Sequence, residues 1–155
     1  MQLDCVRRVR RWAPAAADLQ SWAGAALGRR GAGAELGVCI VGAAESRRLN
    51  RRYRGRDTPT NVLSFPAARL PRASLVGARP RPLGDLVVCA AVVRDEAHAQ
   101  GKALRAHWAH LIVHGALHLI GYDHEHTAAE AARMERREVA VLRRLGFANP
   151  YRSAV

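Results

Sequence analysis

The sequence predicts an α+β fold, a single compact domain in which a small sheet packs against helices. Three observations favour this class. The chain has 155 residues, the length of one domain, and 49% of them are hydrophobic, which is enough for a core. Short apolar runs alternate with helical segments in the middle of the chain, and helical segments dominate its end. No run approaches the roughly 18 apolar residues that a membrane span needs.

The first half of the chain predicts two helices and two strands. Residues 15–28 (AAADLQSWAGAALG) are alanine-rich and indicate a helix that Gly28 closes. Residues 35–42 (ELGVCIVG) are typical of a buried strand, and residues 44–53 of a short basic helix. Residues 60–66 (TNVLSFP) alternate in polarity and predict a strand stopped by proline.

The second half begins with a loop at 66–83, which is rich in proline and arginine, followed by a short strand at 84–89. Helices are then expected at about 90–100, 102–120 and 127–145, the first two split near Gly101. Thr127 and Glu130 have the spacing of a capping box, and Gly146 closes the last helix.

The N-terminus and the cysteines indicate a cytoplasmic protein. The opening MQLDCVRRVRRWAPAAADL is basic but lacks the apolar stretch of a secretory signal. An arginine-rich organelle-targeting stretch would have to overlap the first structured segment. The three cysteines are far apart and form no CxxC pair, so they indicate neither a disulfide framework nor a cysteine zinc site. Cys39 and Cys89 lie in apolar runs and are expected to be small buried hydrophobes.

The net charge of +12 favours a polyanionic partner. Lys102 is the one lysine, and all other cationic residues are arginines, which suit bidentate phosphate contacts. The alternative is that arginine and alanine are abundant through compositional drift alone. Charge by itself does not separate nucleic acids from anionic membranes or acidic proteins.

A histidine motif predicts a metal site. In the segment HWAHLIVHGALHLIGYDHEH, His114 and His118 are four residues apart, which places both imidazoles on one face of a helix. Gly121 can end that helix and turn the chain so that His124 reaches the same ion. Three imidazoles leave one tetrahedral position open, as in catalytic zinc sites. One zinc ion is therefore predicted, although Ni, Cu, Co and Fe accept the same ligands.

The other histidines allow several interpretations. His107 and His110 share the helix stripe of His114, so they can support the ligands, shuttle protons, contact substrate, or simply be polar residues on a helix face. His98 and His126 are expected at the surface.

The spacing His-x3-His-x2-Gly-x2-His is that of the metzincin metalloproteases, but with one departure. The metzincins carry a glutamate, their general base, directly after the first histidine, and Gly115 stands there in this chain. A peptidase without this base would need Asp123 or Glu125 as a substitute.

A second region indicates phosphate binding. In RRLNRRYRGRDTPTNVLSFP (47–66), Arg54 and Arg56 flank a glycine, and Thr58 and Thr60 follow. These cations and hydroxyls can contact phosphate oxygens. The alternative is a solvated basic helix followed by a turn.

The sequence resembles the YbeY family of bacterial endoribonucleases that mature ribosomal RNA. Three blocks match in order and cover, with the ending LGF…PY, most of residues 35–151: LNRRYRGRDTPTNVLSFP, LGDLVVC and HWAHLIVHGALHLIGYDH. Two departures stand out. The stretch before residue 35 is shorter and richer in arginine, which leaves the first strand unassigned, and the loop at 66–83 is basic where acidic residues are common.

The resemblance implies one YbeY-like domain over residues 1–155, with a four-stranded mixed sheet and about five helices. It implies one zinc ion on His114, His118 and His124, and an arginine important for activity, which corresponds to Arg54. It also implies a single-stranded RNA substrate, 3′-end maturation of the small-subunit (16S) precursor rRNA, contact with the small ribosomal subunit, and ribosome quality control. No DNA or membrane partner is expected.

The expected chemistry is phosphodiester cleavage, with His114 and Arg54 as catalytic residues and either metal-bound hydroxide or the RNA 2′-OH as the attacking group. Asp85 can orient a ligand histidine, bind water, or simply serve at a strand start or turn, and Asp123 can support His124. Two other functions remain open, a zinc hydrolase of another substrate such as a peptide, and a ribosome assembly factor without enzymatic activity.

Overall fold

The computed structural model of the chain describes residues 1–67 and 80–152. Its sheet has four strands in the order β1-β2-β4-β3. β1, β2 and β4 are parallel neighbours, whereas β3 runs antiparallel to β4 at one edge. The strands are β1 (Gln2–Arg7), β2 (Ala34–Val41), β3 (Val62–Pro66) and β4 (Arg81–Cys89).

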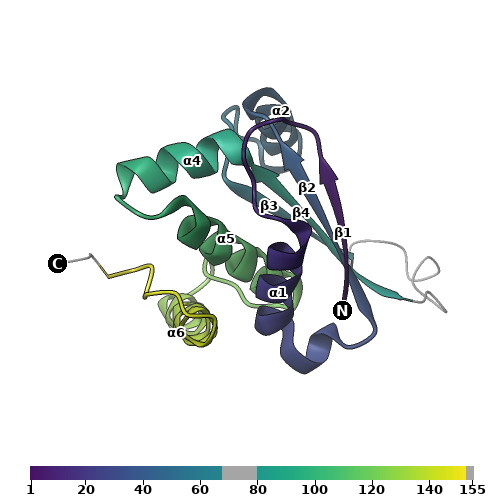
Figure 1. Cartoon of the computed structure of the whole chain (residues 1–155), viewed down its shortest axis with the longest axis vertical. Coiled ribbons are helices and arrows are strands. Elements are labelled where there is room, and N and C mark those ends of the chain that lie inside the picture. The colour runs from purple at the N-terminus through teal and green to yellow at the C-terminus, as the bar shows by residue number, and fades with distance from the viewer. Residues whose placement is uncertain (68–79, 153–155) are drawn as a thin grey trace.

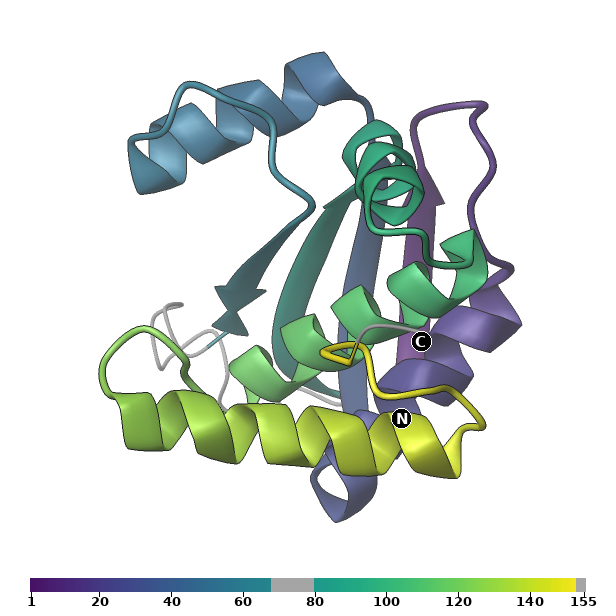
Figure 2. The ribbon, with the colours of Figure 1, turned by 90° about the vertical axis from the view of Figure 1, so that its left-hand side faces the viewer.

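In the part of the chain that the structure describes, five α-helices and one short 3₁₀ helix pack with this sheet, which confirms the predicted α+β class with a mixed sheet. Figure 1 shows α1, α5 and α6 on one side of the sheet, and in Figure 2 α6 lies outermost in front of α5. The helices are α1 (Ala16–Leu27), η1 (Gly28–Gly31), α2 (Ala43–Arg54), α4 (Ala90–Ala99), α5 (Leu104–Leu119) and α6 (Ala128–Arg144). In the two described stretches, no helix is both long and apolar enough to cross a bilayer.

Helix α5 is the centre of the core. It contacts α1, α4, α6 and the strands β3 and β4, and a helix with neighbours on so many sides needs apolar residues around most of its circumference. Trp108, Ile112 and Leu117 are fully buried on it. A helix enclosed in this way has little freedom to shift, so side chains at its end occupy defined positions.

The predicted elements agree with the structure to within a few residues, with two exceptions. Residues Gln2–Arg7, for which the sequence analysis assigned no strand, form β1 beside β2. The C-terminal boundary predicted for the loop at 66–83 is wrong, because β4 already begins at Arg81. Residues 68–79 of this predicted loop lie outside the described residues. Among the described residues, β3 pairs with β4 only from Gly84 onward, so Pro82 has its described partner strand, β2, on one side, a position at which proline is tolerated.

The cysteines are buried less uniformly than expected. Cys89 is completely buried at the end of β4, as predicted. Cys39 is only partly buried, so the prediction for this residue is wrong. Side chains alternate along β2, and Cys39 lies on the face that borders an open groove together with Val87.

Candidate metal centre

Three histidines converge where α5 ends. His114 and His118 project from its last turns, and their ring centroids are 4.7 Å apart. Gly121 follows with a φ of 102°, which L residues with side chains rarely adopt, and its N–H donates to the carbonyl of His118. The chain then turns back, and the ring of His124 lies 5.0 Å from that of His114 and 4.8 Å from that of His118.

The ligand nitrogens of these three residues lie within 4.8 Å of one another, so they can hold one metal ion. His114 and His118 are partly buried and His124 is exposed, which leaves one side of the group open to solvent. The donor set therefore fits the open tetrahedral site that the spacing predicts.

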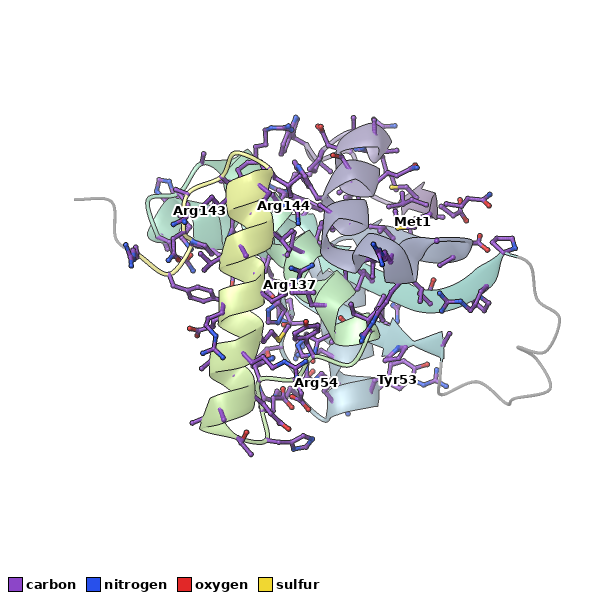
Figure 3. The ribbon with its side chains drawn as sticks, turned by 90° about the horizontal axis from the view of Figure 1, so that it is seen from below. Met1, Tyr53, Arg54, Arg137, Arg143 and Arg144 are labelled. Carbon is purple, nitrogen blue, oxygen red and sulfur yellow. The ribbon has the colours of Figure 1, made fainter. Side chains whose placement is uncertain are left out.

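The histidines border a cleft of about 670 Å³. Its lining also includes the edge strand β3, Arg54 at the end of α2, and Arg56 two residues further along the chain. Gly55 ends α2 in the left-handed conformation, with a φ of 70°, and its N–H donates to the carbonyl of Arg51. Figure 3 labels Arg54 and its neighbour Tyr53, the last two residues of α2. The structure thus brings Arg54 and the three histidines into one cavity.

Arg54 is held by an acidic residue from the histidine loop. Its Nη2 lies 2.7 Å from Oε1 of Glu125, and both side chains are about half exposed. The hydrogen bond from Arg54 lowers the pKa of the Glu125 carboxyl. The same carboxylate oxygen is 4.0 Å from Nε2 of His124, so Glu125 connects the arginine to the histidine group.

A buried carboxylate, Glu138, positions His114. Its side chain is 0% exposed, and it accepts a hydrogen bond from Nδ1 of His114. Because an ionised carboxylate only accepts, the ring proton of His114 stays on Nδ1 and Nε2 is left for a metal. His110 and the Tyr151 hydroxyl also contact this carboxylate. Burial alone would raise the pKa of Glu138, but the hydrogen bonds from His110 and His114 outweigh burial and bring it to about 2.

Glu138 was not predicted as a site residue, although the sequence pattern of α6 contains a signal for it. The buried residues of this helix are Met134, Val141, Leu142 and Glu138, so the glutamate occupies a position of the apolar stripe. A charged residue on such a stripe needs a buried partner. What the pattern does not reveal is that the partner is a histidine of α5.

The substitution Glu138→Gln is expected to lower the affinity for zinc about 10- to 100-fold, the usual cost of losing a group that orients a ligand histidine. The glutamine fills the same space, but its neutral amide accepts less strongly and presents its NH₂ group to hydrogen-bond donors. Competition with a chromogenic chelator measures the affinity. Glu135→Gln, an exposed change on the same helix, is the control. Equal affinities in the two variants would contradict the positioning role.

His107 and His110 each contact a carboxylate and do not line the cleft, and His110 shares Glu138 with His114. His107 is buried, and its Nε2 lies 3.0 Å from Oε1 of Glu96, which also accepts from the side-chain amide of Asn61 at the start of β3. Nε2 of His110 is 3.3 Å from Oε2 of Glu138. Neither histidine is among the described residues that line the cleft, so direct substrate contact is not supported.

The two aspartates do not take the ligand-orienting roles considered for them. Leu86 packs against α5 at Gly115, and strand alternation therefore places Asp85 on the other face of the sheet, in the groove with Gly37 and Cys39. Its proposed role in orienting a ligand histidine is wrong for this reason. Asp123 accepts from the backbone N–H of Glu125 and pairs with His126 at 3.0 Å, so it shapes the loop rather than holding the ring of His124.

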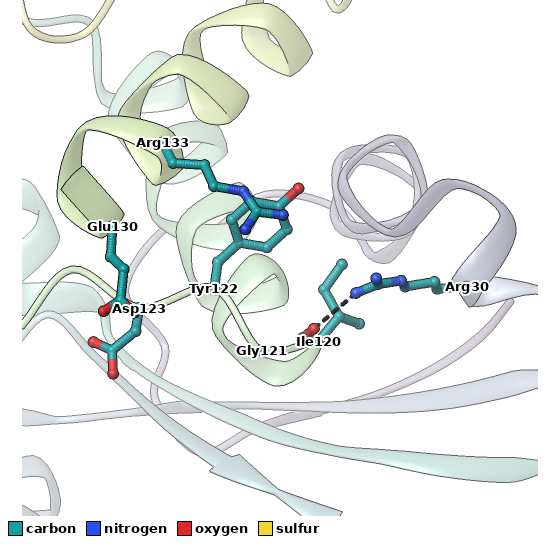
Figure 4. Close-up of a pocket in the computed structure, with 7 residues that line it drawn as sticks. All are labelled: Arg30, Ile120, Gly121, Tyr122, Asp123, Glu130 and Arg133. Carbon is teal, nitrogen blue, oxygen red and sulfur yellow. Dashed lines mark hydrogen bonds between the residues drawn. The ribbon is translucent and has the colours of Figure 1, made fainter. Parts of the chain in front are cut away.

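The loop that carries His124 is also held by contacts with η1 and α6. Figure 4 shows a cavity of about 210 Å³ between Arg30 and Arg133. Arg30 donates to the carbonyl of Ile120 at 2.8 Å, and the guanidinium of Arg133 lies 5.3 Å from the ring centre of Tyr122. These contacts join the loop to η1 and α6. His98 and His126 are exposed, as expected.

The metal-free protein is expected to lose stability as the pH falls from 6.5 to about 4. Burial and the neighbouring His114 and His124 lower the pKa of His118 from 6.5 to about 4. In this window the unfolded chain binds a proton at His118 that the folded chain does not, so the free energy of unfolding decreases with falling pH. Urea unfolding of chelator-treated protein at several pH values measures the effect. His118→Gln should flatten this part of the profile and His98→Gln should not; identical profiles would refute the assignment.

Comparison with known proteins gives consistent matches. The family model described as Endoribonuclease YbeY matches residues 8–146. A protein named endoribonuclease YbeY from Halorhodospira halophila is 54% identical over 139 residues, which cover 90% of this chain and 88% of the relative. One of the same name from Stenotrophomonas maltophilia is 52% identical and covers 89% of this chain and 84% of its own length. The solution structure of TM1509 from Thermotoga maritima has the same fold, with a TM-score of 0.56, 20% identity, and coverage of 97% of this chain and 99% of that one.

Proposed function

Because the chain belongs to the endoribonuclease YbeY family, a group of nucleases that hydrolyse phosphodiester bonds in RNA, we propose that it is a zinc-dependent endoribonuclease specific for single-stranded RNA. We assign to it the 3′-end maturation of small-subunit (16S) precursor rRNA and a part in ribosome quality control. Its partners are then precursor rRNA and the small ribosomal subunit. The proposal treats residues 1–155 as one such domain, of which the family model covers residues 8–146.

One observation carries this proposal: three imidazoles within 4.8 Å of one another share a cleft with Arg54. A group of histidines alone would serve a structural metal equally well. An open ligand position next to a guanidinium is instead suited to a phosphate, because the cation and the arginine contact different oxygens of it.

His114, His118 and His124 would hold the zinc, which supplies Lewis-acid chemistry to the phosphate when bound. Glu138 keeps the ring proton of His114 on Nδ1. Arg54 contacts phosphate oxygens and stabilises the negative charge that develops during cleavage. Because Glu125 and a phosphate compete for the same guanidinium, substrate binding exchanges one anionic partner of Arg54 for another.

A peptidase function is disfavoured by the surroundings of Gly115. A Cβ atom at this position would lie 2.8 Å from Cδ2 of Leu86, closer than real Cβ contacts. The backbone of α5 therefore packs directly against β4, and no side chain, including the glutamate base of the metzincins, fits there without displacing Leu86. The alternative of a non-enzymatic assembly factor does not explain why the histidine group opens into a cleft with Arg54.

The direct test is metal analysis of the purified protein combined with a cleavage assay on precursor small-subunit rRNA. We expect about one zinc per chain, cleavage of the precursor, loss of cleavage with a chelator, and its return when zinc is added. Casein serves as the competing substrate. Chelator-insensitive cleavage would exclude the zinc mechanism, and hydrolysis of casein without RNA cleavage would exclude the nuclease.

A further inference from the structure

An exposed aromatic side chain stands at the rim of the cleft. Tyr53 precedes Arg54 at the end of α2, and 53% of its surface is exposed. Its ring packs edge-to-face with Phe65 of β3, with ring centres 5.1 Å apart and an angle of 76° between the planes. Phe65 is only partly buried, so the two rings form an aromatic ridge, defined here as Tyr53 and Phe65.

The aromatic ridge separates two cavities of different charge. Both residues are among those that line the metal cleft and those that line the groove of about 340 Å³ on the other face of the sheet. The groove is lined by the carboxylates Asp4 and Asp85, which repel phosphate, and by no described cationic residue. The cleft also contains two carboxylates, Asp123 and Glu125, but they lie beside Arg54, Arg56 and the three histidines that would hold a cation. A nucleotide at the ridge therefore has one orientation favoured by charge, with its phosphate toward Arg54 and its base on the rings.

The surroundings of Tyr53 favour a flat, electron-rich ligand. The guanidinium of Arg52 lies 5.3 Å from the centre of the Tyr53 ring, so a planar cation and an aromatic ring are already neighbours at this site. Single-stranded nucleic acids bind surfaces of this kind by stacking bases on aromatic rings beside arginines that follow the backbone. A paired base inside a duplex has no free face to offer, so stacking also selects for single strands.

We propose that the aromatic ridge stacks one nucleobase of single-stranded RNA next to the phosphate that Arg54 and the histidine group contact. This inference rests on the proposed function and adds a base subsite to it. Phe65 buttresses Tyr53 from β3, and Tyr53 presents its ring to the base. The subsite acts on substrate binding and on the choice of single strands, not on the chemical step.

The test compares Tyr53→Ala and Tyr53→Phe with Trp12→Ala in the zinc-loaded protein. Trp12 is an equally exposed aromatic residue, at 52%, and is not among the described residues of the cleft. On an unstructured RNA oligonucleotide, Tyr53→Ala is expected to raise KM about tenfold with little change in kcat. Tyr53→Phe retains the stacking ring, so it should recover most of the substrate binding that Tyr53→Ala loses, and Trp12→Ala should keep wild-type values. An unchanged KM in Tyr53→Ala would overturn the proposal, and so would an equal rise in Trp12→Ala.

A second measurement separates the subsite from catalysis. A single-stranded 2′-O-methyl RNA oligonucleotide carrying 2-aminopurine reports base stacking through quenching of its fluorescence and requires no cleavage. Quenching by the wild type and by Tyr53→Phe but not by Tyr53→Ala supports the subsite, even if the protein cut no RNA and the proposed function were wrong. No quenching by the wild type, or equal quenching by Tyr53→Ala, refutes the subsite while leaving the nuclease function intact.

Discussion

Replacing His114 by alanine is expected to abolish metal binding and to reduce RNA cleavage by about 10³-fold or more, since a Lewis acid contributes several kcal/mol to the stabilisation of phosphoryl charge. His114 contributes one of only three ligands, and its ring lies 4.7 Å from that of His118 and 5.0 Å from that of His124. Without it, two imidazoles remain, of which that of His124 is exposed.

Metal content by mass spectrometry and initial rates of RNA cleavage measure these two losses. His126→Ala is the matched control, because His126 is an exposed histidine of the same loop that pairs with Asp123 outside the ligand group. Since His114→Ala also removes a partner of the buried Glu138, circular dichroism must show that the variant is folded, and His114→Asn provides a polar alternative. A folded variant that retains one zinc per chain and wild-type cleavage would disprove the ligand assignment.

Replacing Arg54 by alanine is expected to leave the metal in place and to reduce cleavage by about 10²- to 10³-fold, the usual cost of removing one group that stabilises transition-state charge. Arg54 is not a donor to the metal, and its described side-chain partner is Glu125. The ligand geometry should therefore survive the substitution, while the phosphate loses a positively charged contact.

Arg48→Ala controls for the general loss of a positive charge from α2, because Arg48 lies on the same helix, interacts with Glu45 and is not among the described residues of the cleft. Arg48→Ala should reduce the rate of RNA cleavage only slightly. Glu125→Gln releases Arg54 from its ion pair without removing the guanidinium, so it should keep most of the activity. If Arg54→Ala cleaves RNA at the wild-type rate, the electrostatic role of Arg54 is wrong.

Local patterns predicted most helices and strands because their causes lie within a few residues. The capping residue Thr127 accepts from the backbone N–H of Glu130 and begins α6 where expected. The strand β1 escaped prediction because its alternation of polar and apolar residues, QLDC, spans only four positions before a basic stretch, and most of its residues are exposed. Pairing with β2 rather than composition makes these residues a strand. The early start of β4 at Arg81 has the same origin, since pairing with β2 overrides a proline-rich composition.

The sequence by itself determined the histidine group, because a four-residue helical spacing and a turn at Gly121 bring the three rings together through short-range geometry. Only the tertiary structure decided which groups surround it. Glu138 reaches His114 across 24 residues, and Arg54 reaches Glu125 across 71, through the packing of α6 on α5 and the position of α2 at the mouth of the cleft. Successive side chains of a strand point to opposite faces of the sheet, and the contact of Leu86 with α5 decides which face is buried. Asp85, one residue earlier, therefore faces away from the histidines.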